Sequence, residues 1–332
     1  MRRIKETLSG LSNELNGNPD DQRNMASRVV GIVKDKGSSL VTTVQEHVVS
    51  VTDTTGALAK QKLLQGLFSS GVIQSKHIGH GLQLGIGYFL SQQTHLSEYV
   101  QRVKFPASGG ITPPHSFPDF DIEAYGITAF INLMNIYNIT PQSLRQHICT
   151  GELKEIVNPS SSGASLYLTA DSSYLIKTVR GYDAKFIQQK FLQAYYEYIH
   201  RTPGTFIAKL FGVYGYIPYI SPQRGITVDS LILRFAIFAN LIPINLDIHE
   251  KYDLKGSAYK RDANFNERIK TSATFKDNDF RDIHKEGLQI PSKIFYELRN
   301  TLTRDVDFLE SLNIMDYSLL LSKIKKNNEI YV

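Results

Sequence analysis

Two short runs rich in β-branched and aromatic residues constrain the fold most. They cover residues 165–169 and 174–179, and the tetrapeptide Ala-Asp-Ser-Ser separates them. Two such runs on either side of a short turn-forming segment are typical of a β-hairpin. Similar runs over residues 209–219 and 230–238 predict further strands. This part of the chain is therefore expected to form an antiparallel sheet.

Helical periodicity dominates elsewhere in the chain. Apolar residues at helical spacing predict helices over residues 57–67, 127–137, 184–201 and 291–311. Another helix is expected to begin at Pro141, because Thr140 is a good N-cap and proline is favoured at the first helical position. With the strands, these helices predict an α+β fold.

Charge and cysteine content limit the possible partners. The chain has a formal net charge of +5, a mild excess that suits a partner carrying phosphate groups. Its single cysteine, Cys149, excludes an internal disulfide and fits a reducing compartment. The most apolar stretch, residues 231–246, is interrupted by Arg, Pro and Asn, so we expect no transmembrane segment. The start of the chain is hydrophilic beyond its basic residues, unlike a signal peptide.

A small-residue segment precedes the hairpin, and a lysine lies within its second strand. Residues 160–164 read Ser-Ser-Ser-Gly-Ala, which would let backbone N–H groups approach phosphate oxygens, although such clusters are more often plain turns. Lys177 has apolar neighbours, so its ammonium group is expected either to enter a cleft or to face water from an edge strand. A small-residue loop, a hairpin and a strand lysine in that order are typical of a kinase-type nucleotide site.

A basic segment follows at residues 251–261. Between residues 255 and 270, five basic residues outnumber two acidic ones. Gly256 permits a tight turn, after which Lys260 and Arg261 offer a point charge and a planar fork for phosphate. The simpler alternative is a solvated basic turn.

Asp316 is an acid in an otherwise apolar stretch from Leu312 to Ile324. It is interpreted as a hydrogen-bonded structural acid, a general base for a hydroxyl nucleophile, or a Mg²⁺ ligand.

Other sites are poorly supported. The pair His77 and His80 lacks further ligands for a metal, and His147 with Cys149 lacks an orienting group for a nucleophile. The chain shows no nucleic-acid-binding module, so no nucleic-acid partner is expected.

Several longer motifs resemble the phosphatidylinositol phosphate kinase family. They are Lys-Tyr-Asp-Leu-Lys-Gly-Ser at 251–257, Thr-Phe-Lys-Asp-Asn-Asp-Phe at 274–280 and Ile-Met-Asp-Tyr-Ser-Leu-Leu at 314–320. The strand Ile-Lys-Thr at 176–178 and the glycine-rich segment 81–87 agree with them, and the resemblance extends from about residue 81 to residue 325. It implies a two-lobed, protein-kinase-like lipid kinase fold with an antiparallel sheet in the N-lobe.

The resemblance also implies roles for individual residues. The catalytic residues would be Asp316, Lys177 and Lys255, with ATP and Mg²⁺ as cofactors and Asp316 as a metal ligand. ATP would contact Lys177 and Lys255 together with Ser162, Gly163 and Ala164 of the small-residue loop. Lys260 and Arg261 would lie near the phosphoinositide headgroup. The region around Gly81–Gly87 would form a homodimer contact.

The resemblance divides the chain at about residue 76. Residues 1–75 lie outside the resemblance, and the helical spacing of their apolar residues predicts a helical or partly ordered extension. Residues 76–240 would form the dimer region and N-lobe, and residues 241–332 the start of a C-lobe that looks incomplete, because relatives continue into a second Mg²⁺-binding acid.

Details of the motifs favour a type I enzyme, which phosphorylates phosphatidylinositol 4-phosphate to the 4,5-bisphosphate. The alternatives are a type II-like 4-kinase acting on phosphatidylinositol 5-phosphate, and a catalytically weak phosphoinositide-binding or scaffold protein. A signalling lipid kinase of this kind is expected in the cytoplasm, peripherally bound to the cytosolic face of membranes, the plasma membrane above all.

Overall fold

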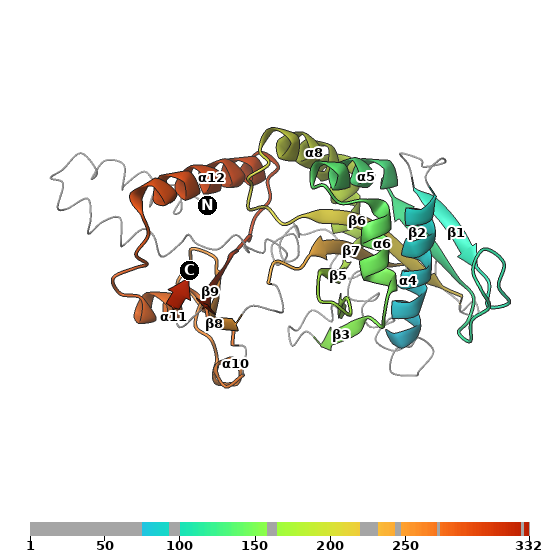
Figure 1. Ribbon diagram of the computed structural model, residues 1–332, viewed down its shortest axis with the longest axis horizontal. Coiled ribbons are helices and arrows are strands. Elements are labelled where there is room, and N and C mark those ends of the chain that lie inside the picture. The colour runs from blue at the N-terminus through green and yellow to red at the C-terminus, as the bar shows by residue number, and fades with distance from the viewer. Residues whose placement is uncertain are drawn as a thin grey trace. The chain divides into compact units, whose positions relative to one another are not determined.

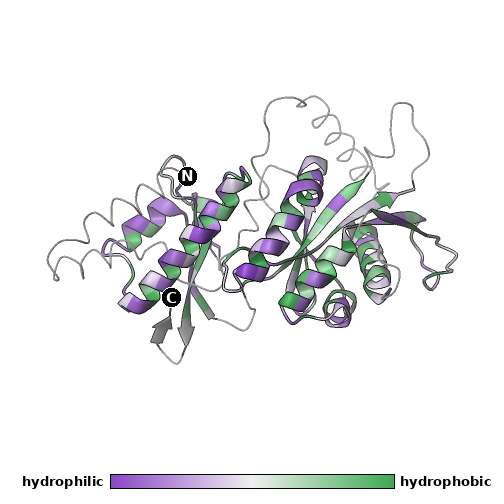
Figure 2. Ribbon diagram, turned by 90° about the horizontal axis from the view of Figure 1, so that it is seen from above, coloured by the Kyte–Doolittle hydropathy of each residue, from purple (hydrophilic) through white to green (hydrophobic). Residues whose placement is uncertain are grey.

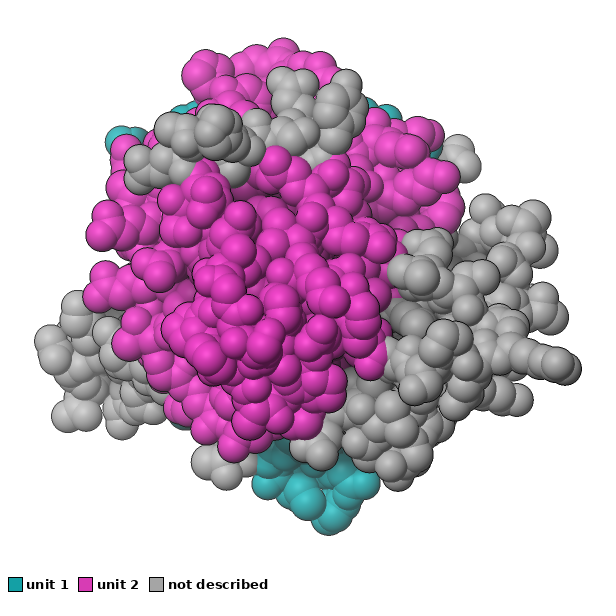
Figure 3. Space-filling view, turned by 90° about the vertical axis from the view of Figure 1, so that its right-hand side faces the viewer, with its two compact units in different colours: residues 1–48, 202–208, 241–332 teal, residues 49–201, 209–240 magenta. Residues whose placement is uncertain are grey.

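The computed structural model describes residues 75–92, 100–157, 165–219, 232–242, 247–270, 273–326 and 329–331. These residues belong to two compact units, coloured separately in Figure 3. Unit 2 contains the described residues of 75–201 and 209–240, and unit 1 contains those of 202–208 and 241–331. The predicted helix over residues 57–67 and the loop residues Ser162, Gly163 and Ala164 lie outside the described residues.

Unit 2 is built on an antiparallel sheet that has seven strands in the described residues. Its spatial order is β1-β2-β6-β7-β5-β4-β3 (Figure 1). The strands are β1 (Gln101–Phe105), β2 (Phe120–Tyr125), β3 (Lys154–Val157), β4 (Ser165–Leu168), β5 (Tyr174–Val179), β6 (Leu210–Pro218) and β7 (Leu233–Ala239). The predicted hairpin is β4–β5, and the two further predicted strands are β6 and β7, so these predictions are confirmed.

The turn between β4 and β5 is fixed by Asp171. Its carboxylate accepts hydrogen bonds from the Thr169 hydroxyl at 2.7 Å and from the Ser173 N–H at 3.1 Å, and it pairs with the ring of His147 on helix α6 (Pro141–Cys149). Burial alone would raise the pKa of Asp171, but these hydrogen bonds outweigh it and hold the pKa well below its usual range. The hairpin is thereby attached to α6.

The helices of unit 2 largely follow the predicted ones. They are α4 (Ser75–Ser91), α5 (Ile127–Ile136), α6, α7 (Gly181–Phe186), the π-helical segment η3 (Ile187–Phe191) and α8 (Leu192–Arg201). The helix predicted over 127–137 is α5, and the one predicted over 184–201 falls within the continuous run from α7 to α8. Thr140 caps α6 as predicted, since its hydroxyl accepts a hydrogen bond from the Ser143 N–H at 3.0 Å.

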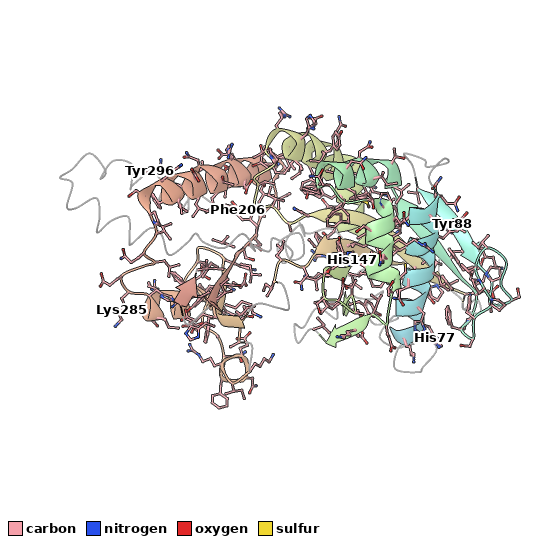
Figure 4. All side chains as sticks on the ribbon, in the orientation of Figure 1. His77, Tyr88, His147, Phe206, Lys285 and Tyr296 are labelled. Carbon is pink, nitrogen blue, oxygen red and sulfur yellow. The ribbon has the colours of Figure 1, made fainter. Side chains whose placement is uncertain are left out.

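Glycines bring α4 close to the sheet. The helix packs on β2 and β6 and against α6, and His77 and Tyr88 lie towards its two ends (Figure 4). A Cβ atom at Gly85 would lie 2.8 Å from the Cβ atom of Ile122 on β2, and one at Gly81 would overlap the ring of Tyr216 on β6. The absence of a side chain at these two positions therefore sets the distance between helix and sheet.

Unit 1 contains a second antiparallel sheet and the longest described helix. The strands are β8 (Asp247–Leu254), β9 (Leu319–Lys326) and β10 (Glu329–Tyr331), in the order β10-β9-β8. The helices are α10 (Phe265–Arg268), α11 (Asp277–Ile283) and α12 (Ser292–Ser311), of which α12 confirms the helix predicted over 291–311. The buried core consists of Tyr252, Leu254, Phe280, Leu288, Phe295 and Leu321.

Hydrophilic and hydrophobic residues alternate along the helices (Figure 2).

Buried Asp305 attaches the segment 202–208 to helix α12. Its carboxylate accepts hydrogen bonds from the Thr205 hydroxyl at 2.5 Å and the Phe206 N–H at 2.8 Å. The fold is α+β with a large antiparallel sheet, as predicted. In the part of the chain that the structure describes, no helix is long and apolar enough to cross a membrane.

The close approach of α4 to β2 predicts that Gly85→Ala destabilises the protein. The added methyl group would overlap Ile122, and overpacking of this kind costs about 1–3 kcal/mol. The free energy of unfolding in urea measures the effect. Gly79→Ala is the matched control on the same helix, because its nearest neighbour would be a Tyr167 ring carbon at 3.7 Å. In an Ile122→Ala background the cost of Gly85→Ala should shrink; an unchanged cost there would contradict this packing.

Candidate functional site

Lys177 lies on an interior strand of the large sheet. It is on β5, between β7 and β4, with Ala236 and Leu166 as its cross-strand partners. The lysine is buried, with only 6% of its surface exposed. The alternative of an edge-strand lysine that faces water is therefore wrong. A buried ammonium group in an apolar sheet needs polar or anionic groups around it, which is the environment that a nucleotide-binding lysine requires.

The second predicted lysine, Lys255, lies in a turn whose backbone is held by one carboxylate. One oxygen of Asp277, at the start of α11, accepts hydrogen bonds from three consecutive N–H groups: Lys255 at 2.9 Å, Gly256 at 2.7 Å and Ser257 at 3.4 Å. Gly256 has a φ of +66°, a conformation that glycine adopts at little cost. The predicted tight turn is confirmed.

Arg261 completes this arrangement. Its Nε donates to the other oxygen of Asp277 at 2.7 Å, and its terminal nitrogen donates to the Asp253 carboxylate at 3.1 Å and to the Asp253 carbonyl. Burial alone would lower the pKa of Arg261, but the contacts with Asp277 and Asp253 outweigh it and raise the pKa. The guanidinium is mostly buried, so it supports the turn from inside.

Lys260, the neighbour of Arg261, differs from it. It is exposed, its φ is +55°, and its ammonium group lies 5.1 Å from the ring centre of Tyr259. The basic pair predicted from the sequence is thus divided between an inward-facing arginine and an exposed lysine. A solvated basic turn describes Lys260 but not Arg261.

Asp316 lies at the same end of the β8–β9 ribbon as Lys255. The ribbon ends at the pair Leu254 and Leu319; Lys255 directly follows the first residue, and Asp316 precedes the second by a short turn. Asp316 is exposed and has a φ of +58°, in the left-handed region that aspartate tolerates better than most residues. An exposed carboxylate at this position suits an acid that acts on a bound substrate.

A polar network in unit 1 was not predicted from the sequence. Glu250 accepts hydrogen bonds from the Tyr252 hydroxyl at 2.8 Å and from Lys323 at 3.1 Å, and it pairs with His284 at 2.8 Å. Burial alone would raise the pKa of Glu250, but these partners outweigh it and lower the pKa. The residues come from β8, β9 and the C-cap of α11, so no local pattern reveals them. The network fastens α11, and with it Asp277, to the ribbon.

The other polar residues singled out in the sequence have structural surroundings. The rings of His77 and His80 contact the ring of Phe117. The Cys149 thiol donates to the carbonyl of Gln83 at 3.2 Å, and burial raises its pKa to about 11. Within the described residues, no group of three or more potential metal ligands lies together.

The predicted site residues belong to different units. Lys177 is in unit 2, whereas Lys255, Lys260, Arg261 and Asp316 are in unit 1. Unit 1 brings Lys255 and Asp316 to one end of its ribbon. The acids that hold this end, Asp253 and Asp277, were not singled out as site residues in the sequence, although both lie inside the motifs quoted above.

Comparison with known proteins shows the family of the chain. Residues 147–330 match the family model described as Phosphatidylinositol-4-phosphate 5-Kinase. Human phosphatidylinositol 4-phosphate 5-kinase type-1 beta is 38% identical over 258 residues, which cover 74% of this chain and 46% of the human protein. The type-1 sktl protein of Drosophila melanogaster is 33% identical over 333 residues, which cover 96% of this chain and 40% of the fly protein.

Human phosphatidylinositol 4-phosphate 5-kinase type-1 alpha is 31% identical over 314 residues, which cover 90% of this chain and 54% of the human protein. The chain belongs to the phosphatidylinositol-4-phosphate 5-kinase family, and it resembles type I members, as its motifs predict. It spans about half the length of the curated relatives it matches.

The contacts of Asp277 predict that Asp277→Ala destabilises the protein by about 3 kcal/mol. The substitution leaves Arg261 partly unpaired in a buried position and removes the acceptor of three N–H groups. Urea unfolding measures the loss. Asp282→Ala on the same helix is the control, because Asp282 is exposed. Equal stabilities for the two variants would contradict the role given to Asp277.

Proposed function

We propose that this chain carries the nucleotide-binding and lipid-binding parts of a lipid kinase, which transfers a phosphoryl group from ATP to the inositol ring of phosphatidylinositol 4-phosphate. One observation carries this proposal: within motifs of a lipid kinase family, Lys255 and Asp316 lie at the same end of one ribbon, and Asp277 holds the turn that contains Lys255. The curated relatives named above are type I enzymes, so a type II-like 4-kinase and a scaffold protein are not favoured.

In the proposed mechanism, Lys177 and Lys255 bind the phosphates of ATP. The Asp316 carboxylate orients the attacking hydroxyl of the inositol ring and takes its proton. The hydroxyl oxygen forms a bond to the γ-phosphorus as the bond to the leaving oxygen of ADP breaks. Positioning and charge neutralisation supply most of the rate in reactions of this kind. Ser162, Gly163 and Ala164 would cover the phosphates through their backbone N–H groups.

This chain offers one carboxylate, that of Asp316, as a ligand for Mg²⁺. Mg²⁺ is often held by one or two carboxylates together with substrate phosphates. The exposed carboxylate of Asp316 would be the protein ligand on this chain. When bound, Mg²⁺ would neutralise charge on the phosphates.

Two further assignments follow from the family. Unit 2 would contain the N-lobe and the dimer region, and residues 241–331 of unit 1 would belong to the C-lobe of a two-lobed kinase. Because Gly81 and Gly85 face the chain's own sheet, a homodimer contact through the region around Gly81–Gly87 would use the half-buried Leu84 instead.

The partner of the site would be a phosphoinositide in an anionic bilayer. The exposed Lys260 would contact the headgroup, and Arg261 would act by holding the turn that presents it. The protein would then work in the cytoplasm, peripherally bound to the cytosolic face of membranes such as the plasma membrane.

The proposal predicts that Lys177→Met lowers both ATP affinity and phosphoryl transfer, the latter roughly 100-fold or more. Methionine keeps the buried apolar stem and removes the charge. The free energy of unfolding is measured alongside, because the buried Lys177 also has an interaction within the protein. Calorimetry with ATP and radiolabelled transfer to phosphatidylinositol 4-phosphate measure the two effects. Lys185→Met on α7, where the lysine is exposed, is the control. Full transfer by Lys177→Met would remove Lys177 from the site.

A second prediction separates Asp316 from the lysines. Asp316→Asn should retain ATP affinity and lose turnover, because an amide cannot accept the hydroxyl proton. The same two measurements apply, with Asp307→Asn on α12 as the control, since Asp307 is also exposed. A variant that turns over normally would rule out the catalytic role. A variant that unfolds would instead favour the structural acid considered from the sequence.

A further inference from the structure

The most exposed hydrophobic side chains of the described residues gather in one short segment. We call residues 255–270 the α10 projection; it leaves the end of β8 and carries α10, on the side of the ribbon away from α12 (Figure 1). Tyr259, Phe265 and Ile269 are 78%, 75% and 65% exposed, the three highest values among the large hydrophobic residues that the structure describes. Exposure of such side chains to water is unfavourable, and a group of them often marks a surface that contacts a partner.

The exposed side chains are held outward by a fixed backbone. Asn264 caps α10, with its side chain accepting from the Glu267 N–H at 2.9 Å and the Glu267 carboxylate accepting from the Asn264 N–H at 2.7 Å. Phe265 and Ile269 are joined by a backbone hydrogen bond of one helical turn, so their side chains lie on the same side. The projection therefore presents them together.

Contacts with α11 anchor the same backbone. The Asp279 carboxylate accepts from the Ala263 N–H at 2.8 Å and pairs with Arg268, and Lys276 pairs with Glu267 at 3.0 Å. A mobile loop could turn its apolar groups towards the core, but these contacts keep the loop in place. Exposure of Phe265 and Ile269 is thus a property of the folded backbone.

The charged residues of the α10 projection indicate which kind of partner its exposed apolar side chains contact. The acids Asp277 and Asp279 are turned inward onto the backbone and the arginines, and Glu267 is paired with Lys276. Lys260 and Lys270 are exposed, Arg268 is partly exposed but pairs with Asp279, and Asp262 is the exposed acid among them. Exposed apolar side chains in a segment with exposed lysines complement an anionic bilayer, into which the apolar groups enter while the ammonium groups stay at the headgroups.

We propose that the α10 projection is a membrane anchor, in which Phe265 and Ile269 insert into the interfacial region of an anionic bilayer beside Tyr259. The inference rests on the proposed function in one respect, that the substrate lies in a bilayer. It adds an apolar contact to the headgroup contact of Lys260. The anchor would place the turn that carries Lys260 at the membrane surface.

The chain contains no tryptophan, which allows a direct test of insertion. Phe265→Trp places a single tryptophan on α10, and Tyr296→Trp places one at an exposed position on α12 of the same unit as the control. Each variant is mixed with vesicles of phosphatidylcholine and phosphatidylserine that carry brominated acyl chains. The emission of Phe265→Trp should shift to shorter wavelength and be quenched by the bromines, whereas that of Tyr296→Trp should not.

Several outcomes would overturn the anchor. They are vesicle binding without quenching of Phe265→Trp, quenching of both variants alike, and absence of vesicle binding. A shift of the Phe265→Trp emission that depends on protein concentration without lipid would assign the surface to a second copy of the chain.

A double variant tests the energetic contribution. Phe265→Ser with Ile269→Ser should weaken co-sedimentation with the anionic vesicles roughly tenfold or more. Ile283→Ser, which removes an apolar side chain 50% exposed on α11, is the matched control and should leave binding unchanged. Equal vesicle binding by both would contradict the anchor.

Turnover of a water-soluble, short-chain phosphatidylinositol 4-phosphate separates the anchor from the proposed function. The double variant should turn this substrate over as the parent chain does, since it needs no bilayer. If the parent chain has no such turnover, the proposed function fails while the vesicle experiments still decide the anchor.

Discussion

Two carboxylates on α11 hold the segment that contains most of the candidate site in unit 1. Asp277 accepts hydrogen bonds from the turn at residues 255–257 and pairs with Arg261. Asp279, two residues further along the helix, accepts from the backbone of Ala263 and pairs with Arg268. Because both carboxylates belong to one helix, the positions of the turn and of the α10 projection are not independent.

These ion pairs differ in kind from those on the surface. The side chains of Arg261 and Asp277 are 13% and 14% exposed, so removal of either partner leaves a desolvated charge. An exposed pair such as Arg201 and Glu197 contributes little, because water and salt screen it. The buried pair therefore gives the turn a defined geometry rather than a large net stabilisation, and the role proposed for Lys255 would require such a geometry.

The parts of the fold that depend on local sequence could be predicted. The cap at Thr140 involves Ser143, and the turn of the β4–β5 hairpin is closed by residues within it. Asp277 contacts residues 16 to 22 positions away, which no periodicity reveals. The burial of Lys177 likewise depends on β7, which is distant in the chain, so the sequence left open whether its strand was an edge. Family motifs predicted the candidate site residues, whereas the geometry around them required the fold.

Under the proposed function, the support by α11 would have a consequence for catalysis at a membrane. A lipid kinase has to hold its nucleotide lysine in register with a headgroup whose height above the bilayer is fixed by the bilayer itself. In this chain the turn carrying Lys255 and the loop carrying Phe265 are attached to neighbouring positions of the same helix. Contact of the projection with a surface would therefore orient the turn as well. Substitutions that destabilise α11 should alter both the turn at Lys255 and the surface contact of the projection. Substitutions of Phe265 should alter the surface contact alone.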